Sequence, residues 1–243
     1  MVEDLTLIDS LAWEAVKKAL NQRVVISSAK LVSSRVNRVW VVETDVRPVV
    51  VKRFLSGRSG NEFESLLMAR LAGLRVPYPL GKEGEYLVTE FIAGDTCELL
   101  INSMFSDRAA EGIGSWLASF HNSLSDGLSK RIMVDATLSN FILNDGQVFG
   151  VDLEDSRVGN PLDDVGKAAA CVLDSEPVFT PVKFDLCVSM IRSYENIANV
   201  DILENVRPFV AKHLRNDAKL KPLFRRTLMA AARSIEKAWP RLA

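Results

Sequence analysis

The most constraining feature of the sequence is a group of polar residues arranged around one short β-hairpin. Asp135 and Asn140 lie five positions apart, immediately before an apolar run. Residues 141–151 contain two apolar runs separated by Asn-Asp-Gly, and an Asp-Gly pair between such runs is a strong hairpin signal. Asp152 follows the second run. We therefore expect a loop carboxylate, a loop amide and a strand-end carboxylate to meet at one end of a two-stranded hairpin.

The side chains of this group have the chemistry of a divalent-cation site. Carboxylate and amide oxygens are suitable ligands for Mg²⁺, which proteins commonly hold with one or two carboxylates together with substrate phosphates. Each residue taken alone is an ordinary turn former, because Asp and Asn often hydrogen-bond nearby backbone groups. The order, the spacing and the hairpin together favour the functional interpretation.

The remainder of the chain predicts a small β-rich half followed by a larger helical half. An amphipathic helix is expected over residues 11–20. Antiparallel strands are expected at residues 24–26, 39–42, 49–51 and 86–92, with a helix over 61–74 that packs through Phe63, Leu66, Leu67 and Leu71. Ala93-Gly94 is a break point, after which helical spacing dominates. We therefore predict an α+β fold of two lobes: residues 1–92 form a small antiparallel sheet with one helix, and residues 93–243 form a mostly helical lobe that contains the hairpin.

Composition indicates an ordinary globular protein and excludes several classes. Apolar residues make up 48% of the 243-residue chain and charged residues 25%. Three cysteines without CxxC spacing argue against a disulfide framework or structural zinc, and two histidines are too few for a histidine metal cluster. No apolar run approaches the ~18 residues of a membrane span, and the N-terminus lacks the basic start of a signal peptide. We expect a cytoplasmic protein without a membrane span.

The hairpin motif resembles the catalytic segment of protein-kinase-like enzymes, in which Asp-x-x-x-x-Asn is followed by a second Asp after a hairpin. Val151-Asp152-Leu153-Glu154 is similar to the Ile-Asp-Phe-Glu of these families, and Gly159-Asn160-Pro161-Leu162-Asp163-Asp164 is similar to their Gly-Asp-Pro-x-x-Asp. The compact, atypical branch that shows these motifs includes aminoglycoside phosphotransferases, RIO kinases, the KEOPS-complex kinase and lipopolysaccharide-core kinases. The resemblance covers residues 30–175 and implies a two-lobed protein-kinase-like fold.

The same resemblance implies a nucleotide site in the first lobe. Lys52 ends an apolar strand, where the family keeps the lysine that holds the α- and β-phosphates of ATP. Glu64, on the following helix, is expected to pair with Lys52 and fix its direction. The Glu90 carbonyl and the Ile92 amide are expected to face adenine, and Ser33 and Ser34 belong to the loop whose amides approach phosphate.

The roles implied for the second lobe are those of phosphoryl transfer. Asn140 and Asp152 would hold Mg²⁺ or Mn²⁺ against ATP, and Asp135 would accept the proton of the acceptor hydroxyl or orient it. Asp164 would brace the catalytic loop through its backbone, and His121 is interpreted as structural. The segment between Asp152 and Gly159 is too short for a long activation segment, which favours a small molecule, a sugar or an RNA-linked partner over a generic peptide as the acceptor.

Two departures from the family pattern leave a second interpretation open. Met133 stands where the family has His in the catalytic loop, and Met cannot donate the hydrogen bonds of that His. The nucleotide loop has Ser33-Ser34-Arg35-Val36-Asn37 where a glycine-rich turn is usual. The alternative is therefore a nucleotide-binding pseudokinase or ATPase that serves as a partner-binding module.

The C-terminal part of the chain is strongly basic. From residue 207 onward, ten Lys and Arg side chains are opposed by only two carboxylates, those of Asp217 and Glu236. Such a segment can attract phosphate, RNA or an acidic partner, or it can form the solvated face of terminal helices.

Overall fold

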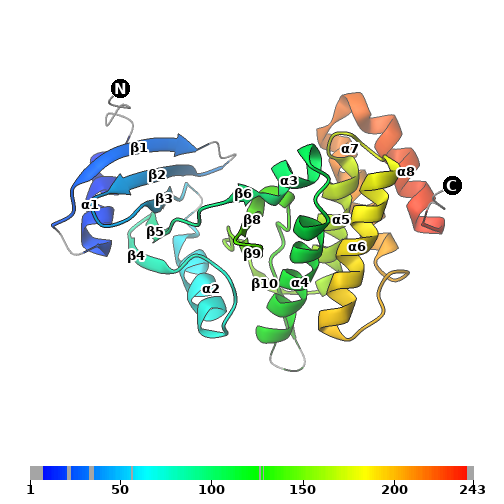
Figure 1. Cartoon of the computed structure of the whole chain (residues 1–243), viewed down its shortest axis with the longest axis horizontal. Coiled ribbons are helices and arrows are strands. Elements are labelled where there is room, and N and C mark those ends of the chain that lie inside the picture. Colours follow the sequence, from blue (N-terminus) through cyan, green and yellow to red (C-terminus); the bar gives the residue numbers. More distant parts are fainter. Residues whose placement is uncertain are drawn as a thin grey trace. The chain divides into compact units, whose positions relative to one another are not determined.

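In a computed structural model of the protein, the structure describes residues 8–20, 23–32, 36–55, 57–125, 127 and 129–239. The chain divides into two compact units, residues 1–93 and 94–243. Each unit contains five of the described strands, which are longer in the first unit, and most of the described helices belong to the second (Figure 1). The predicted α+β class is thus confirmed.

The first unit is built on a five-stranded antiparallel sheet with the order β1-β2-β3-β5-β4. Its elements are α1 (Ser10–Ala19), β1 (Ile26–Val32), β2 (Arg38–Thr44), β3 (Val49–Arg53), α2 (Ser59–Leu71), β4 (Pro79–Glu83) and β5 (Tyr86–Glu90). Strand β4 was not predicted, because Pro79 interrupts the apolar pattern. Proline is tolerated at the first residue of an edge strand, which is the position that it occupies here. The first predicted strand is also displaced, because Val24 and Val25 precede β1 rather than form it.

Alternation along the strands places one apolar face of this sheet against α1. Trp40, Val42, Val49 and Val51 are buried in one cluster with Ala12 and Val16 of α1. Side chains of successive strand residues point to opposite faces. Lys52 therefore projects from the face opposite to Val51, away from the α1 cluster.

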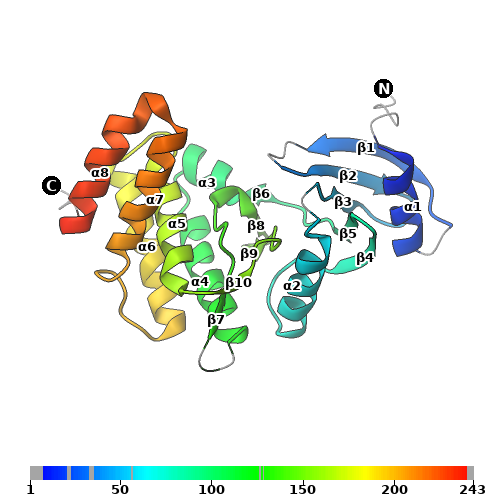
Figure 2. The ribbon, with the colours of Figure 1, turned by 180° about the vertical axis from the view of Figure 1, so that it is seen from behind.

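The second unit combines short strands with six helices among its described residues (Figure 2). The strands are β6 (Asp95–Thr96), β7 (Lys130–Ile132), β8 (Phe141–Asn144), β9 (Gln147–Gly150) and β10 (Arg157–Gly159). The helices are α3 (Cys97–Ser103), α4 (Asp107–Ser123), α5 (Pro161–Asp174), α6 (Pro181–Ala198), α7 (Arg207–Leu220) and α8 (Arg225–Lys237). Helix α4 packs closely against α6: a Cβ added at Gly114 would lie 2.0 Å from the carbonyl oxygen of Met190.

The predicted hairpin is confirmed as the antiparallel pair β8–β9. Asn144 pairs with Gln147, and the two residues between them have positive φ, 45° at Asp145 and 74° at Gly146. A two-residue loop with positive φ at both positions matches the right-handed twist of the flanking strands, and Asp-Gly is a favoured sequence for it. The hairpin thus follows from local turn chemistry.

None of the described helices is both long and apolar enough to cross a bilayer. The expected cytoplasmic location stays a prediction.

Candidate active site

The first unit contains a buried ion pair between β3 and α2. Lys52 Nζ donates a hydrogen bond to Glu62 Oε2 at 2.8 Å, and the two side chains are only 9% and 5% exposed. The ammonium also lies 4.8 Å from the centroid of the Phe54 ring, within the range of a cation–π interaction. Because both charged groups are out of water, the pair holds the Lys52 ammonium in one direction.

The partner of Lys52 differs from the prediction. Glu64 is exposed, and the carboxylate that reaches Lys52 belongs to Glu62. Two positions on a helix are about 200° apart around its axis, so Glu62 and Glu64 face nearly opposite directions. The buried face of α2 consists of Ser59, Glu62, Ser65, Leu66 and Ala69, whereas Leu71, which was expected on the packed face, is 81% exposed.

In the second unit, Asp164 holds the loop that precedes the hairpin. Its fully buried carboxylate accepts hydrogen bonds from the backbone N–H of Met133 at 2.5 Å and of Val134 at 2.8 Å. Val134 has φ 75°, which is unusual for a β-branched residue, so these bonds hold the loop in a conformation that it would otherwise avoid. Asp164 therefore braces the loop through its backbone, as expected.

Asp164 is placed by the start of α5 and supported by α4. The Asn160 side chain caps α5 by accepting from the Leu162 N–H, and Asp164 follows in the first turn. His121 Nε2 lies 3.0 Å from Asp164 Oδ2, and His121 Nδ1 lies 3.0 Å from the Tyr194 hydroxyl. Burial, together with the charge of Asp164, raises the pKa of Tyr194 to about 12. Tyr194 therefore keeps its proton at neutral pH, and the chain of buried polar groups supports the loop that lacks the family histidine.

Asp135 and Asn140 lie together, as the sequence predicts. Asn140 Nδ2 donates to the Asp135 carbonyl at 2.9 Å and lies 3.3 Å from its Oδ2 atom. The Asn140 carbonyl accepts from Val151 N–H at 2.9 Å, which ties the loop to the end of β9. The loop therefore presents the Asp135 carboxylate and the Asn140 amide beside the point where the chain leaves the hairpin.

A lysine of α5 lies within electrostatic range of this loop. Lys167 Nζ is 3.5 Å from Asp217 Oδ1 on α7. Burial lowers the pKa of Lys167, but Cys171, Asp217 and Asp135 raise it more, and the net pKa lies above its ordinary value. Lys167 is therefore a permanent positive charge near Asp135.

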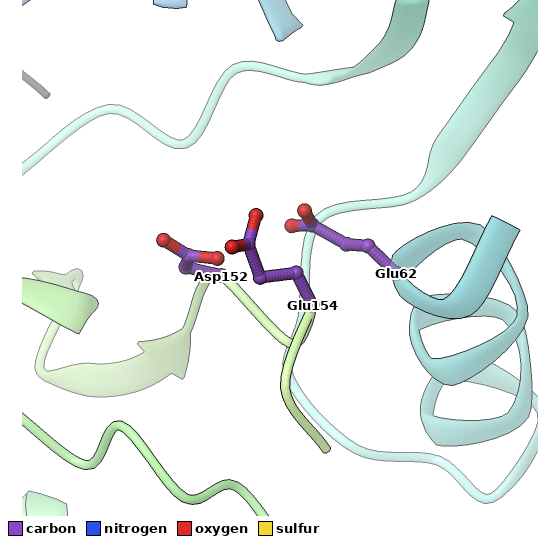
Figure 3. Close-up of side chains that lie close together, drawn as sticks. All are labelled: Glu62, Asp152 and Glu154. Carbon is purple, nitrogen blue, oxygen red and sulfur yellow. The ribbon is translucent and has the colours of Figure 1, made fainter. Parts of the chain in front are cut away.

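A second carboxylate accompanies Asp152 after β9. The carboxylate oxygens of Asp152 and Glu154 approach to within 4.8 Å of each other, and both side chains project from the same short segment (Figure 3). Asp152 has φ 63°, a left-handed conformation that Asp tolerates better than most residues. Figure 3 also labels Glu62 on α2, the partner of Lys52.

Glu154 was not among the expected ligands. The signal for it was present, because Asp152 and Glu154 are two positions apart directly after the hairpin. The carboxylate oxygens of Asp152 and Glu154 lie close together, and with the amide oxygen of Asn140, the ligand that the sequence predicts, they would make an all-oxygen donor set. This set suits Mg²⁺ or Mn²⁺ rather than a metal that prefers sulfur or imidazole.

The other residues predicted to contact the nucleotide are Glu90, Ile92, Ser33 and Ser34. Glu90 ends β5 and Ile92 follows two positions later, close to the boundary between the units. The Glu90 N–H donates to the Tyr78 carbonyl at 2.9 Å, and its carboxylate accepts from the Tyr78 N–H at 3.2 Å. Their contacts with adenine stay a prediction. Ser33 and Ser34 lie outside the described residues.

Comparison with solved structures identifies the class of fold. No family model matches the sequence, and no curated protein matches it either. Many solved structures match, and kinases are among them. The chain shares its fold with these kinases, and this is the protein-kinase-like fold that the sequence predicts.

Three of these structures illustrate the likeness. An amicoumacin kinase in complex with AMP-PNP and Ca²⁺ is 12% identical, with a TM-score of 0.67 over 86% of this chain and 88% of its own. APH(2″)-IIa, in a ternary complex with streptomycin and ATP, is 15% identical, with a TM-score of 0.58 over 94% of this chain and 98% of its own. A putative fructosamine-3-kinase from Thermobifida fusca is 15% identical, with a TM-score of 0.65 over 95% of this chain and 100% of its own.

Proposed function

We propose that the protein is an ATP-dependent phosphotransferase that transfers the γ-phosphate of ATP to a hydroxyl group, with a small molecule or a sugar favoured as the acceptor over a protein. The observation that carries the proposal is the arrangement in the second unit. There, Asp135 and Asn140 are held together on a loop whose end is hydrogen-bonded to the segment carrying Asp152 and Glu154. The fold supports the proposal, because the solved structures that share it include kinases with bound ATP or its analogue.

The residues of the second unit would have different roles in phosphoryl transfer. Asn140, Asp152 and Glu154 would hold Mg²⁺ or Mn²⁺, which would neutralise the negative charge of the triphosphate. Asp135 is exposed. Its carboxylate would accept the proton that the acceptor hydroxyl loses as its oxygen bonds to the γ-phosphorus, while the bond from that phosphorus to the β,γ-bridging oxygen breaks and ADP leaves. Asp164 keeps the Asp135 loop in one conformation, so that the carboxylate needs little rearrangement.

The first unit would supply the positive charge that the nucleotide needs. Lys52 would hold the α- and β-phosphates, with Glu62 fixing the direction of its ammonium. Glu90 and Ile92 would offer backbone groups to adenine. Phosphoryl transfer depends mainly on such alignment and charge neutralisation, since the protein forms no covalent bond in the step.

A second candidate function rests on one residue. Met133 is fully buried where the family has a histidine, and its side chain offers no hydrogen-bond donor to the loop. The alternative is a nucleotide-binding pseudokinase or ATPase that serves as a partner-binding module. Under this alternative the Asp135 carboxylate has no transfer step to assist.

The test separates nucleotide binding from turnover. Purified protein is incubated with γ-labelled ATP and Mg²⁺ or Mn²⁺, while binding of AMP-PNP is measured by calorimetry. We expect Asp152→Asn to weaken metal-dependent nucleotide binding and abolish release of label. Asp135→Asn should abolish release of label and leave binding unchanged. Asp145→Asn in the hairpin turn is the matched control, because Asn-Gly also suits this turn.

Each outcome decides between the interpretations. Turnover that survives both Asp135→Asn and Asp152→Asn would come from a contaminant and would remove the support for transfer. Binding of AMP-PNP without turnover, in the presence of a panel of sugars and small alcohols, would favour the pseudokinase. Absence of any AMP-PNP binding would refute both functions.

A further inference from the structure

Helices α7 and α8 carry a surface of six cations, which we call the basic face: Lys212, Arg215, Lys219, Arg225, Arg226 and Arg233. The two helices pack against each other and lie side by side in both views (Figures 1 and 2). Two adjoining hollows of about 550 and 360 Å³ lie on this surface. Both hollows are lined by Arg225 and Met229, and no described carboxylate lines either of them.

The cations form two rows of similar length. Lys212, Arg215 and Lys219 follow one another on α7 at intervals of three and four residues, which places them on one side of that helix. Arg226 and Arg233 have the same seven-residue separation on α8. Seven residues of α-helix span about 10.5 Å, and packed helices lie roughly 8–10 Å apart. The basic face is therefore wide enough for several phosphate groups.

Most of these cations have no carboxylate partner among the described residues. Lys212 pairs with Asp163 at 2.5 Å, and Arg215 pairs with Glu236. Lys219 donates a hydrogen bond to the Asn216 side chain and forms no ion pair with a described residue. Neither hydrogen bonds nor ion pairs join the side chains of Arg225, Arg226 and Arg233 to another described residue. Within the described part of the chain, four adjacent positive charges therefore have no carboxylate partner.

Helix stability does not explain the arginines at the start of α8. Arg225 and Arg226 stand in its first turn, which contains no acidic residue and has no side-chain cap. The N-terminal end of a helix carries the positive end of the backbone dipole, where cations are disfavoured. The two arginines therefore weaken the helix slightly, and their placement calls for another reason.

We propose that the basic face binds the phosphodiester backbone of a nucleic acid without reading its sequence. Four of the six cations are arginines, whose planar guanidinium groups bind phosphate oxygens in pairs. Duplex nucleic acid carries about one negative charge per 1.7 Å of its axis when both strands are counted, so a 10.5 Å length of duplex carries on the order of six phosphates. The proposal is independent of phosphotransfer, because no residue of the basic face belongs to the candidate active site.

A nucleic acid fits this surface better than a membrane does. Binding in a membrane interface requires a wide apolar face that enters the acyl region. The apolar side of α8, formed by Leu228, Ala232 and Ile235, is already buried. Met229 is the one large apolar side chain that lines the hollows. The exposed Leu223 lies at the corner between the helices, outside the lining.

The test measures affinity against salt with a fluorescein-labelled 20-base-pair RNA duplex, the same sequence as a DNA duplex, and its single strand. If four cations each neutralise one phosphate, the logarithm of affinity falls with a slope of about −3.6 against log salt, and affinity drops about 150-fold between 50 and 200 mM. The Arg225→Ala/Arg226→Ala/Arg233→Ala triple should reduce the slope to about −0.9.

The control triple removes the same net charge elsewhere. Arg23, Arg47 and Lys82 are exposed in the first unit and form no ion pair with another described residue. Their replacement by Ala should leave affinity and slope unchanged, and circular dichroism checks that both triples fold. Equal weakening by both triples, or no binding to any of the three probes at 50 mM salt, would overturn the proposal. Binding to vesicles of anionic phospholipid or to polyglutamate, without binding to any of the three nucleic-acid probes, would also overturn the proposal.

Discussion

Replacing Glu62 by Gln tests whether the ion pair between β3 and α2 has the energetic role that its burial implies. The substitution keeps the size of the side chain and one hydrogen-bond acceptor, but it removes the negative charge that lies 2.8 Å from the Lys52 ammonium. Two unit charges 2.8 Å apart attract each other by about 6 kcal/mol at an effective dielectric constant of ~20. This figure is an upper limit, because both groups lose hydration when they are buried.

The measured cost of removing one partner of a buried pair is about 3–5 kcal/mol. Because Gln retains an acceptor, we expect the lower end, about 3 kcal/mol. For a unit of 60–100 residues this lowers the unfolding temperature by about 12–24 °C. Hydrogen exchange of the β2 and β3 amides, followed by mass spectrometry, reports the change in the first unit directly.

Glu64→Gln is the matched control, because it makes the same chemical change two residues away on the same helix. Glu64 is exposed, so its replacement should change stability by no more than about 0.5 kcal/mol. A larger effect at Glu64 than at Glu62 would mean that α2 presents a different face to the sheet, and it would refute the pairing with Lys52. The double substitution Lys52→Met/Glu62→Leu should cost less than Glu62→Gln alone, because it removes both charges of the pair.

Three further predictions concern the second unit. Asp164→Asn should destabilise the protein by about 1–3 kcal/mol, because the amide would present a donor to two backbone N–H groups. It should also lower label release from ATP with little change in AMP-PNP affinity. An unchanged turnover would contradict the bracing role. Burial lowers the pKa of Lys183 to about 8. The ordinary pKa of lysine is higher, so between about pH 8 and 10.5 the unfolded chain binds more protons than the folded protein. The free energy of unfolding of wild type should therefore rise relative to that of Lys183→Met as pH increases through this window. Parallel curves of unfolding free energy against pH for the two proteins would exclude the shift. Burial raises the pKa values of Cys97 and Cys187 to about 12. At pH 7.5, iodoacetamide should therefore not modify either thiol in the native protein, whereas both should react in urea-unfolded protein. Mass spectrometry of the peptides measures the modification.

Local sequence signals were sufficient for the features that depend on neighbouring residues. The β8–β9 hairpin follows from Asp145-Gly146, because both positions need positive φ. The place of Asp164 in the first turn of α5 follows from the Asn-Pro pair that starts the helix. The Asp135–Asn140 contact spans five residues, so the loop itself brings the two side chains together.

Other features depend on how a helix turns about its axis, which neighbouring residues do not decide. In the sequence, Glu62 and Glu64 both lie on the helix that follows Lys52, and their separations from Lys52 along the chain differ by only two residues. Packing of Leu66 and Ala69 against the rest of the first unit selects the face that carries Glu62. The same limit applies to β4, whose edge position accommodates a proline that argues against a strand in the sequence alone.

The basic C-terminal segment shows most clearly which features the sequence determines and which depend on the tertiary structure. The sequence by itself determined that ten cations are opposed by two carboxylates after residue 206. Only the tertiary structure decided which of them are neutralised, because Asp163 comes from α5 to meet Lys212, and Glu236 from α8 to meet Arg215. An ion pair requires two groups within a few ångströms, and for residues tens of positions apart that distance is set by the packing of helices.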